Sequence, residues 1–179
     1  FFKLDTLILS AEFSSLSDNI KYIKNCTEEE MNNMENLHST LAVFYIDSKI
    51  DGIEWIRIHY SYPAAFPEDV LDQMADNPKV CRYMDIPLQH ISDKVLDNMH
   101  RHVTGAWTRE LIGKMRERVP GVVLRTTMIV GHPGEGKRDF NELLEFAKEA
   151  RFERLGAFKY SEEEGTYGAE NFKDSISAK

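Results

Sequence analysis

From about residue 53 to residue 160, the chain alternates between stretches with the two-residue period of a strand and stretches with the 3.6-residue period of a helix. Four stretches rich in β-branched and aromatic residues predict strands, over 53–60, 80–88, 122–130 and 155–160. The stretches between them predict helices that begin near Pro67, Ser92 and Trp107 and over 139–150. Strands and helices that alternate at this spacing form βα units on a parallel sheet.

Periodicity alone leaves two architectures open: an open, doubly wound sheet and part of a (β/α) barrel. Both place their ligand sites at the carboxyl ends of the strands. The last predicted helix is strongly amphipathic, and we expect its apolar residues to face the core. These are Phe140, Leu143, Leu144, Phe146 and Ala147.

The charge of the chain bears on its partners. Its formal net charge is −8, from 22 basic and 30 acidic residues. A compact nucleic-acid-binding protein usually presents a basic face to phosphates, whereas the basic residues here are scattered. Direct nucleic-acid binding is therefore not expected, and a protein or small-molecule substrate stays open.

No apolar run in the sequence reaches the roughly 20 residues that a membrane-spanning helix needs. The first residues show no basic segment followed by an apolar one, as a secretory signal would. We therefore predict a cytoplasmic protein with no membrane partner. The sequence gives no indication of oligomeric state.

The chain has two cysteines, Cys26 and Cys81. Two cysteines 55 positions apart provide neither a disulfide framework nor a CxxC pair, and they match no zinc-site pattern. Cys81 precedes an apolar stretch, where a small buried side chain is the simplest interpretation. We predict no metal site within this chain.

Two strand ends carry the residues of most chemical interest. The first is the stretch 87–92 (PLQHIS), and the second is the glycine-rich turn at 129–135 (IVGHPGE). Each can be an ordinary βα loop, with Ser92 as a helix N-cap, Gln89 bonded to backbone and His90 as a satisfied buried histidine. The glycine turn matches neither the Walker A nor the dinucleotide-binding pattern.

Taken together, four segments resemble successive barrel strands of the radical S-adenosylmethionine (SAM) methylthiotransferases. In order, they are 55–63 (WIRIHYSYP) for the third strand, 83–96 (YMDIPLQHISDKVL) for the fourth, 124–135 (LRTTMIVGHPGE) for the fifth, and 158–161 (FKYS) with 164–166 (EGT) for the sixth. Three runs, 82–86 (RYMDI), 89–90 (QH) and 160–165 (YSEEEG), resemble the ribosomal-protein-modifying, RimO-like branch more than the tRNA-modifying, MiaB-like branch. The resemblance implies an α/β fold that is a partial (β/α) barrel of radical SAM type, with parallel strands and outer helices.

That resemblance also divides the chain. Residues 49–169 are the barrel portion, from its third to its sixth strand. Residues 1–48 match poorly, and we interpret them as one barrel strand near 5–11 plus a helix. Residues 170–179 are a tail that leads to a C-terminal domain outside this chain.

The implied reaction is the addition of a methylthio group to the β-carbon of an aspartate in a small-subunit ribosomal protein. The implied cofactors are SAM and 4Fe–4S clusters. A CxxxCxxC triplet holds one of these clusters, which reduces SAM to a 5′-deoxyadenosyl radical. This chain contains no such triplet. We therefore expect it to be a portion of a methylthiotransferase that is inactive alone, with a tRNA adenosine methylthiotransferase or a non-catalytic SAM-binding module as alternatives.

By position in these motifs, the resemblance implies six SAM-binding residues. They are Gln89, Ser92, Arg125, Ile129, Val130 and Gly131. Gln89 and Ser92 would approach the ribose or the methionine part of SAM. Ile129, Val130 and Gly131 would line the adenine. Arg125 would pair with the SAM carboxylate, although strand parity gives it an even chance of facing the helices instead. No catalytic residue is assigned.

A third hypothesis is an unrelated α/β enzyme that uses Asp85, His90 or Glu135 as an acid–base group. A strand order that failed to bring 89–92 and 125–131 to one rim of the sheet would favour it.

Overall fold

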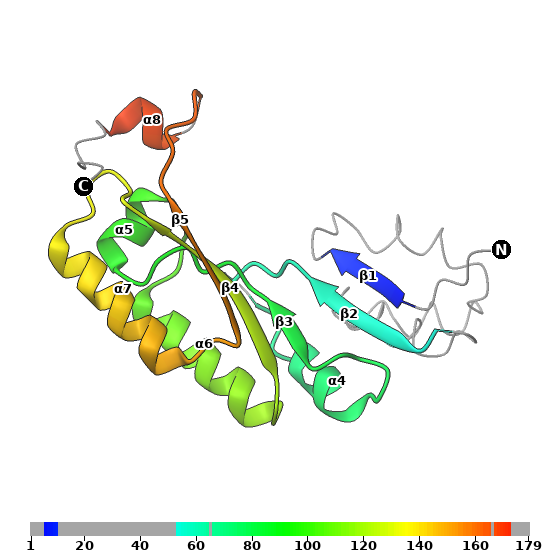
Figure 1. Ribbon diagram of the computed structural model, residues 1–179. Coiled ribbons are helices and arrows are strands. Elements are labelled where there is room, and N and C mark those ends of the chain that lie inside the picture. Colours follow the sequence, from blue (N-terminus) through cyan, green and yellow to red (C-terminus); the bar gives the residue numbers. More distant parts are fainter. Residues whose placement is uncertain (1–5, 11–52, 65, 166, 173–179) are drawn as a thin grey trace.

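The computed structural model describes residues 6–10, 53–64, 66–165 and 167–172 (Figure 1). Most of the segment 1–48, including its predicted helix and Cys26, lies outside these residues, as does most of the predicted tail. The described strands are β1 (Thr6–Ser10), β2 (Trp55–His59), β3 (Tyr83–Asp85), β4 (Val123–Val130) and β5 (Arg154–Lys159). The described helices are α4 (Val70–Asp76), α5 (Asp93–Asn98), α6 (Gly105–Arg118), α7 (Lys137–Ala150) and α8 (Tyr167–Asn171).

Each of the described strands lies beside the strand that precedes it in the sequence. β1 pairs with β2, β3 pairs with β4, and β4 pairs with β5, always in parallel. These pairs form a two-stranded sheet, β1–β2, and a three-stranded sheet, β3–β4–β5. The two sheets are connected by an isolated parallel bridge between Ile56 of β2 and Val80, which precedes β3, and by a 2.8 Å hydrogen bond from the Ser61 N–H, which follows β2, to the Asp85 carbonyl. A doubly wound sheet reverses its strand order at a switch point, whereas the described strands follow one another in sequence order. The prediction of a partial (β/α) barrel is confirmed.

The sheet has one face covered by helices. In Figure 1, α5, α6 and α7 lie along one side of β3, β4 and β5. Alternate strand residues are buried on that side, among them Ile56 and Ile58 of β2 and Leu124 and Met128 of β4. They belong to one core with helical residues, the largest of which are Leu71, Met74, Leu111, Met115 and Phe146.

The intervening strand residues point to the opposite side, which we call the open face because no described element covers it (Figure 1). It carries Trp55, Arg57 and His59 from β2, Tyr83 and Asp85 from β3, Arg125, Thr127 and Ile129 from β4, and Arg154 and Phe158 from β5. In a closed barrel, this face lines the interior.

The predicted strand at 80–88 is regular only over β3. Pro87 has no backbone N–H to donate, and Gln89 adopts a left-handed backbone conformation with φ of 70°. Pairing resumes at Gln89, which forms a parallel bridge with Met128. The residue pattern did not predict α8, which crosses the boundary placed at residue 169.

The prediction for the apolar face of α7 is correct for Leu143 and Phe146 and wrong for Phe140 and Leu144. The last two are more than 40% exposed. α6 lies against the C-terminal part of α7, where Arg116 donates to the Ala150 carbonyl at 2.8 Å. Within the described ranges, nothing covers the flank with Phe140 and Leu144, so the buried stripe is narrower than the apolar pattern. None of the described helices has both the length and the apolar character that crossing a bilayer requires.

Two phenylalanines on α7 provide a test of this placement. Phe146 is 2% exposed and packs edge-to-face on Phe152, with ring centroids 5.7 Å apart, whereas Phe140 is 43% exposed. We expect Phe146→Ala to lower the free energy of unfolding by about 3–5 kcal/mol and Phe140→Ala by about 0.5 kcal/mol or less. Urea unfolding followed by circular dichroism measures both, and equal losses would contradict the assigned orientation of α7.

Candidate functional site

The site is built around Gln89, where the loop after β3 remains tied to β4. The Gln89 N–H donates to the Thr127 carbonyl at 2.9 Å, and the Gln89 carbonyl accepts from the Ile129 N–H at 2.8 Å. These bonds extend the pairing of the two strands to their carboxyl ends. The side-chain Oε1 of Gln89 is buried and has no hydrogen-bond partner among the described residues.

A pocket of about 400 Å³ opens beside Gln89 at the carboxyl ends of β4 and β5. Its lining is drawn from five places in the chain. These are the loop at Gln89, Ile129 with His132 at the end of β4, the segment 158–161 with Glu163 after β5, Asn98 at the end of α5 with Met99 and Arg101 beyond it, and Tyr167 with Gly168 at the start of α8. This volume lies in the range of small-molecule sites. The pocket occupies the rim where barrel enzymes bind their ligands.

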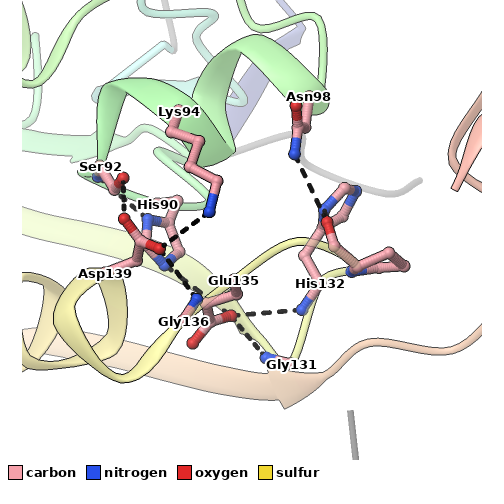
Figure 2. Close-up of polar contacts among 10 residues, drawn as sticks. His90, Ser92, Lys94, Asn98, Gly131, His132, Glu135, Gly136 and Asp139 are labelled. Atoms are coloured by element: carbon pink, nitrogen blue, oxygen red, sulfur yellow. Dashed lines mark hydrogen bonds and ion pairs between the residues drawn. The ribbon is translucent and has the colours of Figure 1, made fainter. Parts of the chain in front are cut away.

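The glycine turn after β4 is held by one carboxylate. Glu135 Oε2 accepts from the Gly131 N–H at 2.6 Å and from the His132 N–H at 3.2 Å (Figure 2). Gly131 and Gly134 have φ values of 78° and 87°, which glycine adopts at low cost. Burial raises the pKa of Glu135, although the two backbone donors act in the opposite direction. Glu135 thus shapes the turn from inside instead of facing the pocket.

A second polar group locks the loop after β3 against α7. The Ser92 N–H donates to Nδ1 of the fully buried His90 at 3.0 Å, so neutral His90 carries its proton on Nε2. The Ser92 hydroxyl donates to Asp139 Oδ1 at 2.7 Å, and this bond is the main cause of the lowered pKa of Asp139 (Figure 2). His90 Nε2 faces Glu135 at 3.9 Å. The group therefore couples the two loops that border the pocket.

Ser92 differs from its prediction as a helix cap. It occupies the N-cap position of α5, but its side chain makes no capping hydrogen bond. Its hydroxyl bonds to Asp139 instead, because α7 brings a carboxylate within reach.

His132 and α8 close one side of the pocket. His132 is buried, and its Nδ1 lies 2.9 Å from the Pro133 carbonyl, so Nδ1 carries the proton. Its ring packs edge-to-face on Tyr160, with centroids 5.0 Å apart. A Cβ on Gly168 of α8 would lie 3.0 Å from the Tyr160 hydroxyl and 3.6 Å from His132 Nε2. α8 therefore approaches this pair at a distance that favours glycine.

Arg125 points to the open face, which settles its direction. Its Nη1 donates to both oxygens of Asp85, at 2.8 and 2.6 Å, and Asp85 is only 1% exposed. This bond is the first cause of the raised pKa of Arg125. Arg125 is thus already paired, and it does not line the rim pocket.

Of the six predicted residues, the structure brings Gln89 and Ile129 into one pocket. Gly131 lies at the adjoining turn, Val130 packs on the helix side against the core, and Ser92 is buried between α5 and α7. Sequence reasoning missed other lining residues, namely His132, Arg101, Tyr160 and Tyr167. His132 stands in the glycine turn and Tyr160 in the segment 158–161, so motifs marked both places without showing that these side chains line a pocket. Arg101 and Tyr167 belong to segments without a recognised motif.

The strand order brings residues 89–92 and 125–131 to one rim, so it does not favour an unrelated acid–base enzyme. The three groups considered for that role are also engaged elsewhere: Asp85 with Arg125, His90 with the Ser92 N–H, and Glu135 with the turn.

The sequence pattern of the Radical SAM superfamily matches residues 4–147, most of the chain. The chain belongs to the radical SAM superfamily. It is 58% identical over 130 residues to the ribosomal protein uS12 methylthiotransferase RimO of Phocaeicola vulgatus. This match covers 73% of this chain and 30% of that protein. It is 59% identical over 129 residues to the RimO of Bacteroides fragilis, covering 72% and 30%. The predicted resemblance to RimO is confirmed, and the chain spans about 30% of the length of these relatives.

Among solved structures, the fold is similar to coproporphyrinogen III oxidase (HemN) from Escherichia coli, a radical SAM enzyme. The TM-score is 0.59 at 18% sequence identity, and the match covers 76% of this chain and 31% of HemN. At this identity, the likeness supports the barrel fold alone.

The residues present do not fit an iron–sulfur cluster. Such clusters are held by several cysteine thiolates, and the sequence has only Cys26 and Cys81. Burial raises the pKa of Cys81, which disfavours the thiolate. In the part of the chain that the structure describes, no three His, Cys, Asp or Glu side chains gather into a metal site.

The buried His90 predicts a pH dependence of stability. Burial lowers its pKa from the ordinary 6.5 to about 4, while the charge of Asp139 acts in the opposite direction. The unfolded chain therefore binds this proton first as the pH falls. The contribution of neutral His90 to the free energy of unfolding is complete above about pH 6.5 and is lost toward pH 4. Over this range, the free energy of unfolding falls by up to about 1.4 kcal/mol per pH unit.

Because the pKa of Glu135 is raised, Glu135 changes the free energy of unfolding with pH in the opposite direction. The effect of His90 is therefore measured as the difference between the wild type and His90→Asn. The asparagine oxygen can still accept from the Ser92 N–H. Urea unfolding at several pH values should show the wild type losing stability relative to the variant between pH 6.5 and 4. Parallel curves would contradict a neutral, buried His90.

Proposed function

We propose that this chain provides part of the barrel of a radical SAM methylthiotransferase that modifies an aspartate of a small-subunit ribosomal protein in the cytoplasm. The observation that carries the proposal is the 57–59% identity to RimO proteins over about 130 residues, some 72% of the chain. The names of those relatives specify ribosomal protein uS12 as the substrate. The chain's acidic net charge agrees with a protein substrate better than with tRNA.

SAM, when bound, supplies the methyl group and the radical chemistry of this family. We propose that Gln89 and Ile129 contact it in the rim pocket. The buried Oε1 of Gln89 has no partner in the described chain, as expected for a group that accepts a hydrogen bond from a ligand. The apolar side chain of Ile129 lines the pocket, and the adenine would pack against it, next to the turn at Gly131.

The other predicted residues support these contacts. Ser92 fixes the loop that carries Gln89 through Asp139, and Val130 anchors the end of β4 in the core. Arg125 lies on the open face below the pocket and can offer a carboxylate its remaining donors while Nη1 stays on Asp85. The aromatic walls around Tyr160 and Tyr167 keep water away from the ligand.

Calorimetry with SAM and the 179-residue chain tests the pocket. We expect binding that Gln89→Ala weakens about three- to tenfold, the effect of losing one hydrogen bond. Gln73→Ala is the matched control, because Gln73 lies on α4, away from the pocket. Absence of binding by the wild type, or equal affinities for wild type and Gln89→Ala, would contradict the assignment.

A chimera tests the substrate. In the Bacteroides fragilis RimO, the segment that matches this chain is replaced by the corresponding residues of this chain. The chimera is designed to keep the cysteines of the host protein. We expect mass spectrometry of uS12 to show a methylthio group in place of one hydrogen of an aspartate. A folded, cluster-loaded chimera that modifies a tRNA adenosine would favour the MiaB-like alternative, and one that modifies neither would contradict the proposal.

A further inference from the structure

The open face is basic, although the chain as a whole is acidic. Among the described residues of this face, three arginines, Arg57, Arg125 and Arg154, stand against one carboxylate, Asp85. The chain carries a net charge of −8. Arg125 and Arg154 lie directly opposite each other on neighbouring strands, so like charges meet there unless an anion lies between or above them.

Asp85 neutralises only one of the three. It takes both of its short contacts from Arg125 Nη1, and its other neighbour is His59, at 3.9 Å. No carboxylate in the described segments lies within 4 Å of Arg57 or Arg154. Arg57 is the more confined of the two, because it is half-buried whereas Arg154 is exposed.

Arg57 is also held ready to bind an anion. Its guanidinium lies over the Tyr83 ring, with Cζ 3.9 Å from the ring centroid. Its Nε is buried and has no hydrogen-bond partner in the described part of the chain. Stacking of this kind fixes the plane of the guanidinium and leaves its N–H edge directed sideways, which suits a carboxylate bound by two parallel hydrogen bonds.

Arg57 lies in a different sector from the rim pocket. The pocket is lined by residues that follow β3, by β4, β5 and α8, and by none from β2. The paired Arg125 lies on β4, between Arg57 and the β5 side. Beside Arg57 on β2, Trp55 is 62% exposed, so an apolar contact adjoins the unpaired cation. A SAM molecule in the rim pocket therefore leaves this sector available to a second ligand.

We propose that Arg57 binds the carboxylate of the aspartate in the polypeptide substrate, with Trp55 contacting the residues next to it. This inference rests on the proposed function. One stacked guanidinium beside an aromatic side chain suits a single acidic residue in a peptide. A nucleic acid instead needs a basic surface that follows several phosphates, and the acidic chain would repel it.

Trp55 provides the measurement. Trp55 and Trp107 are the two tryptophans, so Trp107→Phe leaves Trp55 as the reporter beside Arg57. In this background, the full chain is titrated with a short peptide that has one central aspartate and otherwise uncharged residues. The same peptide with asparagine, SAM, and a short RNA are titrated in parallel.

We expect the aspartate peptide to bind about tenfold more tightly than the asparagine peptide, as a charge-assisted pair provides. Arg57→Gln should abolish that preference, and Arg57→Lys should retain only part of it, because an ammonium group cannot form the two-bond pair. Neither substitution should change the affinity for SAM. Arg138→Gln removes the same charge from the exposed start of α7 and should leave the preference unchanged.

Four results would overturn the proposal: no preference for aspartate in the wild type, a preference that survives Arg57→Gln, an effect of Arg57→Gln on SAM alone, or RNA binding that depends on Arg57. Circular dichroism of each variant shows that its fold is intact. The chimera assay distinguishes failure of this proposal from failure of the proposed function. A chimera that fails to modify uS12 would contradict the methylthiotransferase function. An active chimera whose Arg57→Gln form has an unchanged KM for the aspartate substrate would contradict only the role of Arg57.

Discussion

Two backbone hydrogen bonds at Gln89 hold the candidate site in place. They tie the loop after β3 to Thr127 and Ile129 of β4, past the point where Pro87 interrupts regular pairing. The left-handed conformation of Gln89 costs about 1–2 kcal/mol for a residue with a Cβ. The two bonds offset that cost and set the direction of the side chain. The pocket, the buried Gln89 oxygen that has no partner among the described residues, and the approach of β4 to the rim all depend on this one position.

The arrangement of strands and helices was predictable because each element buries one face and so repeats its apolar residues at a fixed period. β4 is the clearest case, with Leu124, Thr126 and Met128 on the helix side and Arg125 on the other. The direction of Arg125 itself was not predictable, since an arginine suits either side until its partner is known. Phe140 shows the opposite failure: it fits the apolar stripe of α7, yet nothing in the described fold covers it.

The site was predictable at the level of loops more than of side chains. Motifs marked the two segments that meet at the rim, because short turns require glycine and proline at fixed places. They could not show that Ser92 bonds to Asp139, since that contact joins residues 47 positions apart and has no local signature. The same holds for Tyr167, which reaches the pocket on a short helix whose composition gives little helical signal.

β5 has a consequence for how copies of the chain behave toward one another. Five of its six residues are exposed, and in the described sheet only β4 pairs with it. An open edge of this kind can accept a strand from a neighbouring molecule. Arg154 and Lys159 place a positive charge at each end of the edge, so two copies that approach in this way repel each other. Because salt screens that repulsion, self-association of the chain should increase with ionic strength.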